Sequence, residues 1–257
     1  MKKISALKKI ILPGFIIAVI SLAILQYFFY EVPILTYHRI SSFCFDTPLL
    51  CVSPKSFQRQ MDFISSHRYQ VISLEELVNA LSRKKNLPRK TVVITFDDGT
   101  EDAYQYGFPI LKKYGFAATI FIITDFIGKP GFLSYNQLKE IQKWGIDIGS
   151  HTKTHVFLPK VNDKKLWQEI FESKQEIQSR LGKEVNLFSY PMGGFNPQAQ
   201  FFLKKSGYKG ACATNRGRYR FTPDIFALRR IKMTDDSDNP LVMWVKLSGI
   251  YNLFRRK

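Results

Sequence analysis

The chain has 257 residues, of which 45% are hydrophobic and 14% aromatic, so it is long and apolar enough for one domain with a sizeable core. This composition excludes a disordered or fibrous protein. The net charge of +17 predicts an anionic partner: a nucleic acid, an anionic lipid or an envelope polymer. Because the sequence has no zinc-finger, basic-zipper or aromatic RNA-binding motif, we expect no nucleic-acid partner.

The amino-terminal segment differs in composition from the rest of the chain. Four lysines and no acidic residue precede an uncharged stretch over 10–30, which is long enough to cross a hydrocarbon core of roughly 30 Å. The lysines predict that the amino terminus stays in the cytoplasm and that the remainder is exported. A signal peptide cleaved near 21–23 is the alternative, but the apolar stretch continues to Tyr30. We therefore expect a transmembrane signal-anchor in 1–30 and an extracytoplasmic domain over 31–257, in the periplasm or at the cell surface.

The charge and the cysteines of the predicted exported part bear on its contact with the membrane and on its redox compartment. It has 34 basic and 21 acidic residues, a net charge of +13, and it ends in KLSGIYNLFRRK, which mixes basic and apolar side chains. This end is either solvated or a second contact with the membrane surface. Cys44 and Cys51 are seven residues apart and either form a disulfide in an oxidising compartment or remain packed thiols.

From Glu31 onward, patterns typical of strands and of helices alternate. Apolar stretches predict strands at 32–37, 69–73, 91–96, 117–123, 146–150, 186–190, 208–213 and 226–231. Helix signals lie between them: the cap Ser53-Pro54, the capping boxes Ser73/Glu76 and Ser134/Gln137, the stops Gly115 and Gly182, and the cap Asn196-Pro197. This alternation predicts a parallel α/β fold, and a distorted (β/α)7–8 barrel after the anchor suits the length best.

Three candidate patches follow predicted strands. Asp97 and Asp98 follow 91–96, His151 follows 146–150, and Met192 comes just after 186–190. In a barrel, chemistry gathers at the carboxyl ends of the strands, so we expect these patches on one rim.

The histidine pair predicts a metal site. His151 and His155 are four residues apart, and on a helical turn this spacing puts both imidazoles on one side; two unrelated histidines are the alternative. A carboxylate from another strand end would complete a three-ligand set that stays open to water. Of the adjacent Asp97 and Asp98, one can bind the metal while the other takes a proton from water.

These residues carry a resemblance to a known family. TFDDG at 95–99 and HTKTH at 151–155 resemble the first two motifs of the polysaccharide deacetylases, also called the NodB-homology family or carbohydrate esterase family 4, and FSYPMGGFN at 188–196 resembles the third. The similarity runs from about Val32 to Met233. It implies a metal-assisted hydrolysis that removes an acetyl group, usually from N-acetylglucosamine.

The resemblance also assigns roles. It makes Asp97 the general base and Asp98, His151 and His155 the metal ligands, with a backbone N–H near Met192 as an oxyanion donor. One such donor commonly contributes about 3–4 kcal/mol. Two imidazoles and a carboxylate suit zinc, with cobalt, nickel and manganese as alternatives.

Two departures from the family pattern affect the acid and the base. Many members have Arg-x-Pro-Tyr in the third motif, where this chain has SYPM at 189–192, so Arg230 either orients the base instead or is a surface arginine. No histidine follows His155 to serve as the usual acid. His38, at the end of the first strand, resembles the acid of deacetylases that act on poly-N-acetylglucosamine biofilm polymers; a packed or surface histidine is the alternative. His67 lies in a predicted helix and is expected to be exposed.

These features predict a membrane-anchored, metal-dependent carbohydrate N-deacetylase. Its expected substrate is poly-N-acetylglucosamine, followed by peptidoglycan or another acetylated glycan. One alternative is an esterase or deformylase acting on an acylated or lipid-linked sugar. The other is an inactive barrel that binds an anionic glycan or the membrane, although such a module needs no base beside a metal.

Overall fold

The computed structural model describes residues 20–21, 30–43, 48–214 and 224–254. Apart from 20–21 and Tyr30, the predicted anchor lies outside these residues. In the described part of the chain, no helix combines the length and apolar character needed to cross a membrane.

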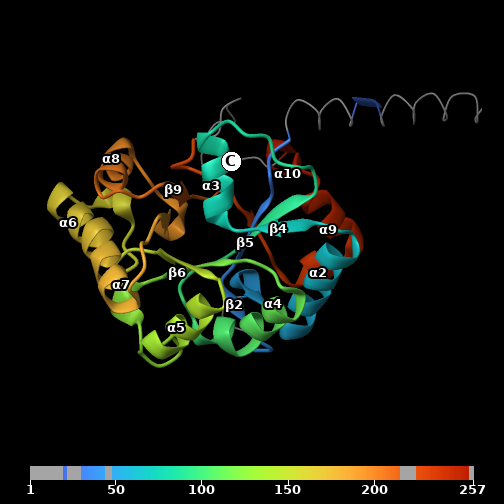
Figure 1. Cartoon of the computed structure of the whole chain (residues 1–257), viewed down its shortest axis with the longest axis horizontal. Coiled ribbons are helices and arrows are strands. Elements are labelled where there is room, and N and C mark those ends of the chain that lie inside the picture. Colours follow the sequence, from blue (N-terminus) through green and yellow to red (C-terminus); the bar gives the residue numbers. More distant parts are fainter. Residues whose placement is uncertain (1–19, 22–29, 44–47, 215–223, 255–257) are drawn as a thin grey trace, which may run out of the picture.

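Parallel strands form one curled sheet with helices on its outer side (Figure 1). The strand order is β10-β1-β5-β6-β7-β8-β9, and β4 also pairs with β5. The strands are β1 (Ile34–Tyr37), β4 (Gln70–Ile72), β5 (Thr91–Phe96), β6 (Thr119–Ile122), β7 (Asp147–Ser150), β8 (Leu187–Ser189), β9 (Gly210–Cys212) and β10 (Ile231–Lys232). The predicted parallel α/β alternation is confirmed. A separate short ladder joins β2 (Arg39–Ile40) and β3 (Cys51–Val52).

The two edges of the sheet approach each other through the segment that leads into β10. The Ala213 N–H donates to the Leu228 carbonyl, and the Leu228 N–H donates to the Ala211 carbonyl. The same segment then pairs with β1 through Ile231. The sheet is therefore curled into a half-barrel, and the segment that leads into β10 connects its two edges. This form is consistent with the predicted (β/α)7–8 barrel.

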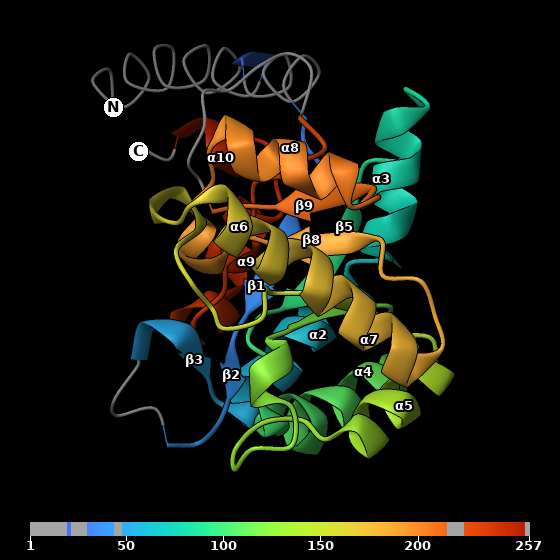
Figure 2. The same ribbon diagram turned by 90° about the vertical axis from the view of Figure 1, so that its left-hand side faces the viewer.

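Helices follow most strands, as Figure 2 shows from the side. They are α2 (Pro54–Ser66), α3 (Leu74–Ser82), α4 (Phe108–Tyr114), α5 (Tyr135–Lys143), α6 (Asp163–Trp167), α7 (Ser173–Leu181), α8 (Pro197–Lys205), α9 (Pro240–Lys246) and α10 (Tyr251–Phe254). Two π-helical turns, η2 (Ala103–Gly107) and η5 (Gln168–Glu172), precede α4 and α7, and single 3-10 turns are η1 (Pro48–Leu50), η3 (Thr124–Phe126), η4 (Leu158–Lys160), η6 (Pro191–Gly193) and η7 (Asp235–Asp238). Both predicted capping boxes form, and Gly115 and Gly182 end their helices in the left-handed conformation.

Alternation along the strands divides the core in two. One cluster lies between sheet and helices, and the stacked rings of Tyr37 and Phe96 belong to it. The second contains the opposite residues of six strands, Ile34, Ile72, Val93, Phe121, Leu187 and Cys212, together with Leu228 from the segment before β10. In β5, the residues that face the same side as this second cluster are Val93 and Thr95, and Asp97 is the next residue in that alternation. Strand alternation therefore carries Asp97 to the inside of the curled sheet at its carboxyl end.

The cysteines lie in two different settings. Cys51, in β3, is disulfide-bonded. Cys44, its predicted partner, lies outside the described residues. Cys212 in β9 is a free thiol, and burial raises its pKa to about 12. Cys212 is therefore a packing residue.

Candidate active site and metal site

A buried ion pair forms the base of the site. Arg230, just before β10, donates from Nη1 to Asp97 Oδ1 at 2.7 Å and from Nη2 to Oδ2 at 2.6 Å. Both residues are 3% exposed. The guanidinium also donates to the hydroxyls of Thr95 and Ser189, so strands β5 and β8 both hold it in place. Arg230 is thus not the surface arginine of the alternative interpretation.

This pairing decides the charge of Asp97. Burial by itself would raise the pKa of the Asp97 carboxyl, but Arg230 foremost, with His151 and His38, holds that pKa well below its ordinary value. The carboxylate therefore stays ionised, with both oxygens fixed by a planar donor pair.

Beside this pair, three side chains converge as a metal-binding set. Asp98 Oδ1 lies 3.4 Å from Nε2 of His151 and 3.4 Å from Nε2 of His155. The potential ligand atoms all lie within 4.8 Å of one another. Asp98 Oδ1 is buried and has no hydrogen-bond partner among the described residues. An unsatisfied carboxylate oxygen facing two imidazoles fits a divalent cation that accepts nitrogen and oxygen ligands.

Backbone geometry aims Asp98 at the histidines. Asp98 and Gly99 both have a φ of +68°, in the left-handed region that favours glycine. A Cβ on Gly99 would lie 2.8 Å from the Ile122 side chain. The chain therefore turns sharply after β5, and Gly99 gives it both the conformation and the space.

The two histidines lie in a loop after β7, so the predicted helical turn was wrong. Thr152 and His155 have φ values of +68° and +61°. The rings nevertheless lie with their centroids 5.0 Å apart. Nδ1 of His151 lies 2.7 Å from the Ser189 carbonyl, a hydrogen bond that directs Nε2 toward Asp98.

A fully buried carboxylate holds this loop. Glu169, in η5, accepts the N–H groups of Lys153 and Thr154 at 2.8 Å each and the Thr154 hydroxyl at 2.6 Å. Lys165 supplies the counter-charge at 2.7 Å. Left-handed residues other than glycine cost on the order of 1–3 kcal/mol each. The bonds to Glu169 help to offset this cost and keep the loop in one conformation.

His38 lies on the same rim, directly after β1. Its Nε2 is 3.9 Å from Asp97 Oδ2, and the side chain is 19% exposed. Burial lowers the pKa of His38 below its ordinary value, and the nearby Asp97 and Asp98 carboxylates offset this only in part. Near neutral pH the imidazole is therefore mostly neutral.

The structure brings together six of the seven predicted site residues: Asp97, Asp98, His151, His155, His38 and Arg230. The seventh, Met192, lies in η6 just after β8 with a φ of +54° and an exposed side chain. Its predicted role rests on its backbone N–H. His67 is exposed at the end of α2 and stacks on Phe63, as expected for a residue outside the site.

Sequence reasoning missed three supporting residues. Thr95 had a signal, because it lies two residues before Asp97 and must face the same side of β5. Ser189 and Glu169 had none, because only the folded sheet brings them to Arg230 and to the 151–155 loop.

An aspartate pair beside two histidines, at the carboxyl end of a curled parallel sheet, fits a metal-assisted hydrolase. The family model for polysaccharide deacetylases matches residues 84–211. The Bacillus subtilis (strain 168) protein YxkH, whose name places it among the polysaccharide deacetylases, is 34% identical over 204 residues, covering 79% of this chain and 72% of that protein. The chain therefore belongs to the polysaccharide deacetylase family.

The chain is also similar to a relative whose name includes a substrate and to a deacetylase of known structure. A poly-β-1,6-N-acetyl-D-glucosamine N-deacetylase of Staphylococcus aureus (strain MRSA252) is 29% identical over 205 residues, covering 74% of this chain and 70% of that protein. The structure of Streptococcus pyogenes deacetylase PplD in complex with acetate superimposes with a TM-score of 0.78 at 28% identity, covering 84% of this chain and 97% of that one.

Proposed function

We propose that this protein is a metal-dependent N-deacetylase of an N-acetylglucosamine polysaccharide. The observation that carries the proposal is the buried, bidentate Asp97–Arg230 pair directly beside Asp98, His151 and His155. The pair keeps one carboxylate ionised as a base, while the unsatisfied Asp98 oxygen provides a ligand for a cation.

Each residue has one task in this proposal. Asp98, His151 and His155 hold the cation, which we expect to be zinc, with cobalt, nickel or manganese as alternatives. Such a cation lowers the pKa of water and polarises a carbonyl oxygen. Asp97 takes the proton from the attacking water, and Arg230 keeps its carboxylate oriented.

The leaving amine and the oxyanion need partners of their own. A backbone N–H near Met192 supports the developing oxyanion. His38 protonates the leaving amine. Because the pKa of His38 is lowered, the ring must first receive a proton during the reaction. The proton that Asp97 takes from the attacking water can supply it, since Asp97 Oδ2 lies 3.9 Å from His38 Nε2.

The names of the relatives support the substrate class. The S. aureus relative is named for poly-β-1,6-N-acetylglucosamine, and the S. pyogenes structure contains acetate, the small product expected from such a reaction. We therefore put poly-β-1,6-N-acetylglucosamine, a biofilm polymer, first and peptidoglycan or another acetylated glycan second. An esterase or deformylase would use the same residues and differ only in its substrate.

For the location, we propose an anchor in 1–30 and a catalytic domain over 31–257 outside the cytoplasm. Support comes from Glu31, whose N–H donates to the Gly249 carbonyl at 2.7 Å and whose carboxylate pairs with Arg229. An anchor would thus join the domain directly before β1, whereas the site lies after the carboxyl end of that strand. With such an anchor the site would face away from the membrane, which would favour a polymer over a lipid-linked sugar.

The test is acetate release from β-1,6-linked N-acetylglucosamine oligomers by the full chain in detergent, loaded with zinc, beside Asp97→Asn. We expect release that a chelator abolishes and that the variant lowers about 10²–10⁴-fold. A protein that binds metal but releases no acetate would redirect the substrate to other acylated glycans or esters. A protein that binds glycan but binds no metal and releases no acetate would be the inactive barrel, and the proposal would fail.

A further inference from the structure

We infer that Asp102 is a positioning residue for His38, serving protonation of the leaving amine and not the attack of water. This inference rests on the proposed function, in which His38 is the acid. Asp102 lies at the start of η2, four residues after Asp98, and is 9% exposed. This largely buried carboxylate is neither a metal ligand nor the base or acid of the proposed function.

Asp102 holds the backbone on the far side of His38. Its Oδ1 accepts the Ile40 N–H at 3.2 Å, and its Oδ2 accepts Nε–H of Arg39 at 3.0 Å. The Thr100 hydroxyl lies 2.7 Å from Asp102 Oδ1 and 3.2 Å from the His38 carbonyl. Three groups of the 38–40 segment are thus gathered around the turn that leads from β5 to η2.

The near side of His38 is fixed by a different interaction. Tyr37 ends β1 and pairs with Phe96, and its carbonyl accepts the Asp97 N–H at 2.9 Å. His38 itself lies between β1 and β2, outside both strands. The backbone that carries the His38 imidazole is therefore held on both sides by the same 97–102 segment: by the Asp97 N–H at Tyr37 and by the Asp102 carboxylate at Ile40.

This arrangement ties the acid and the base to one segment of chain. Residues 97–102 carry the base, one metal ligand and the carboxylate that positions the acid. Proton transfer requires heavy atoms about 2.6–3.2 Å apart, so a small shift of the 38–40 backbone removes His38 from reach of the leaving nitrogen. The same shift leaves Asp97 paired with Arg230.

Two substrates separate the acid from the rest of the machinery. An N-acetylglucosamine oligomer expels an amine, which must be protonated, whereas 4-nitrophenyl acetate expels a phenolate that leaves without a proton. For Asp102→Ala we expect kcat on the oligomer to fall about 10²-fold, with KM and the chelator-sensitive ester hydrolysis changed less than about threefold. Asp102→Asn keeps an acceptor for Ile40 and should recover about tenfold of the loss.

The control variants test the role of Asp102 separately from the proposed role of His38 as the acid. His38→Ala should show the same split between the substrates, and Asp97→Asn should lose both reactions. Asp238→Ala is the matched control, since Asp238 also pairs with an arginine and a hydroxyl, both in α2, and makes no hydrogen bond to a predicted site residue in the described part of the chain. It should cause no split. Thermal unfolding and zinc binding of each variant verify the fold, and Asp102→Asn carries the test if Asp102→Ala does not fold.

Three outcomes would each mean something different. If His38→Ala splits the substrates and the Asp102 variants do not, the inference alone is overturned. If the Asp102 variants lower both reactions equally, Asp102 is merely structural, which also overturns it. If His38→Ala changes neither reaction while Asp97→Asn abolishes both, the acid assignment fails and takes the inference with it.

Discussion

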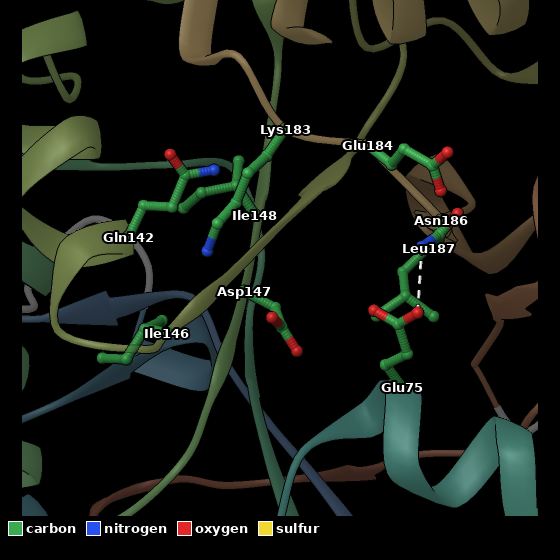
Figure 3. Close-up of a pocket in the computed structure, with 9 residues that line it drawn as sticks. All are labelled: Glu75, Gln142, Ile146, Asp147, Ile148, Lys183, Glu184, Asn186 and Leu187. Atoms are coloured by element: carbon green, nitrogen blue, oxygen red, sulfur yellow. Dashed lines mark hydrogen bonds between the residues drawn. The ribbon is translucent and has the colours of Figure 1, made fainter.

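The carboxylates at the two ends of the sheet have pKa values that are shifted in opposite directions. At the carboxyl end, Asp97 is paired with Arg230 and its pKa is held well below the ordinary value. At the amino end, Asp147 begins β7 and lies in a pocket with Glu75 and Lys183, which Figure 3 shows. Burial, and then the nearby Glu75, raises the pKa of Asp147 to about 6.

The difference between these two carboxylates shows what distinguishes the candidate active site from a surface pocket. Glu75, Asp147 and Glu184 all line the pocket in Figure 3, but they come from separate elements, and Glu184 is 77% exposed. At the carboxyl end, a guanidinium fixed at hydrogen-bonding distance keeps Asp97 ionised where water is scarce. A fixed cation, more than burial or a concave shape, decides at which end a carboxylate stays ionised.

Removing that cation should have the largest effect. Arg230→Gln leaves Asp97 buried without a counter-charge, and we expect a loss of about 3–5 kcal/mol in the free energy of unfolding together with loss of deacetylation. Arg229→Gln is the matched control; its partner Glu31 is more exposed, so the cost should stay near 1 kcal/mol or below. Urea unfolding of both variants measures the difference, and equal losses would contradict this account.

The same pair predicts a pH dependence with a definite sign. The pKa of Asp97 in the folded protein lies below its ordinary value of 3.8, so the pairing contributes stability above that pH. The contribution is lost as the pH falls through the lower, folded value. The gap in stability between the wild type and Arg230→Gln should therefore be full at pH 7 and shrink as the pH falls toward the lower, folded value of the wild type. A gap that widened with acid would refute the pairing.

A middle-sized effect is expected from Glu169→Gln, which weakens the support of the 151–155 loop. The variant loses a charge-assisted bond to Lys165 and loosens the bonds to two backbone N–H groups. We expect zinc affinity to fall about 10–100-fold, the usual cost of a lost outer-shell partner. Titration calorimetry against zinc measures it. Glu172→Gln, whose 44% exposed side chain lies 3.5 Å from Lys153, is the control and should bind as the wild type does.

The sequence was sufficient for the parts of the fold that local chemistry determines. Capping boxes, glycine stops and apolar stretches located most strands and helices, because each signal acts within a few residues. The strand predicted at 226–231 was wrong in its bounds, since β10 shares only Ile231 with it. The two π-helical turns, the β2–β3 ladder and the short helix α10 carried no such signal, whereas α9 begins at a cap, Asn239-Pro240, that the prediction did not use. The form of the elements without a signal depends on packing against elements distant in sequence.

The site residues likewise divide into those that local motifs predict and those that only the folded chain brings together. The two aspartates and two histidines were predictable, because they belong to short motifs at strand ends. Arg230 could be proposed but not placed, since the approach of β10 to β1 decides whether it is buried or exposed. Glu169 and Asp102 were invisible, because each acts on a backbone that only the folded chain brings near.

At the amino end, the smallest effect is expected from Asp147→Asn, which should stabilise the protein above about pH 6 and leave deacetylation unchanged. The pKa of Asp147 in the folded protein is about 6, above its ordinary value of 3.8, so ionisation carries a penalty that is absent below pH 3.8 and complete above about pH 6. Because the side chain is partly exposed, solvent reduces that penalty, and we expect a gain of only about 0.5–1 kcal/mol. Thermal unfolding at pH 4 and pH 8 tests this, with the exposed Glu184→Gln as a control that should gain nothing. An equal gain at both pH values would mean that packing, and not charge, sets Asp147 apart from Asp97.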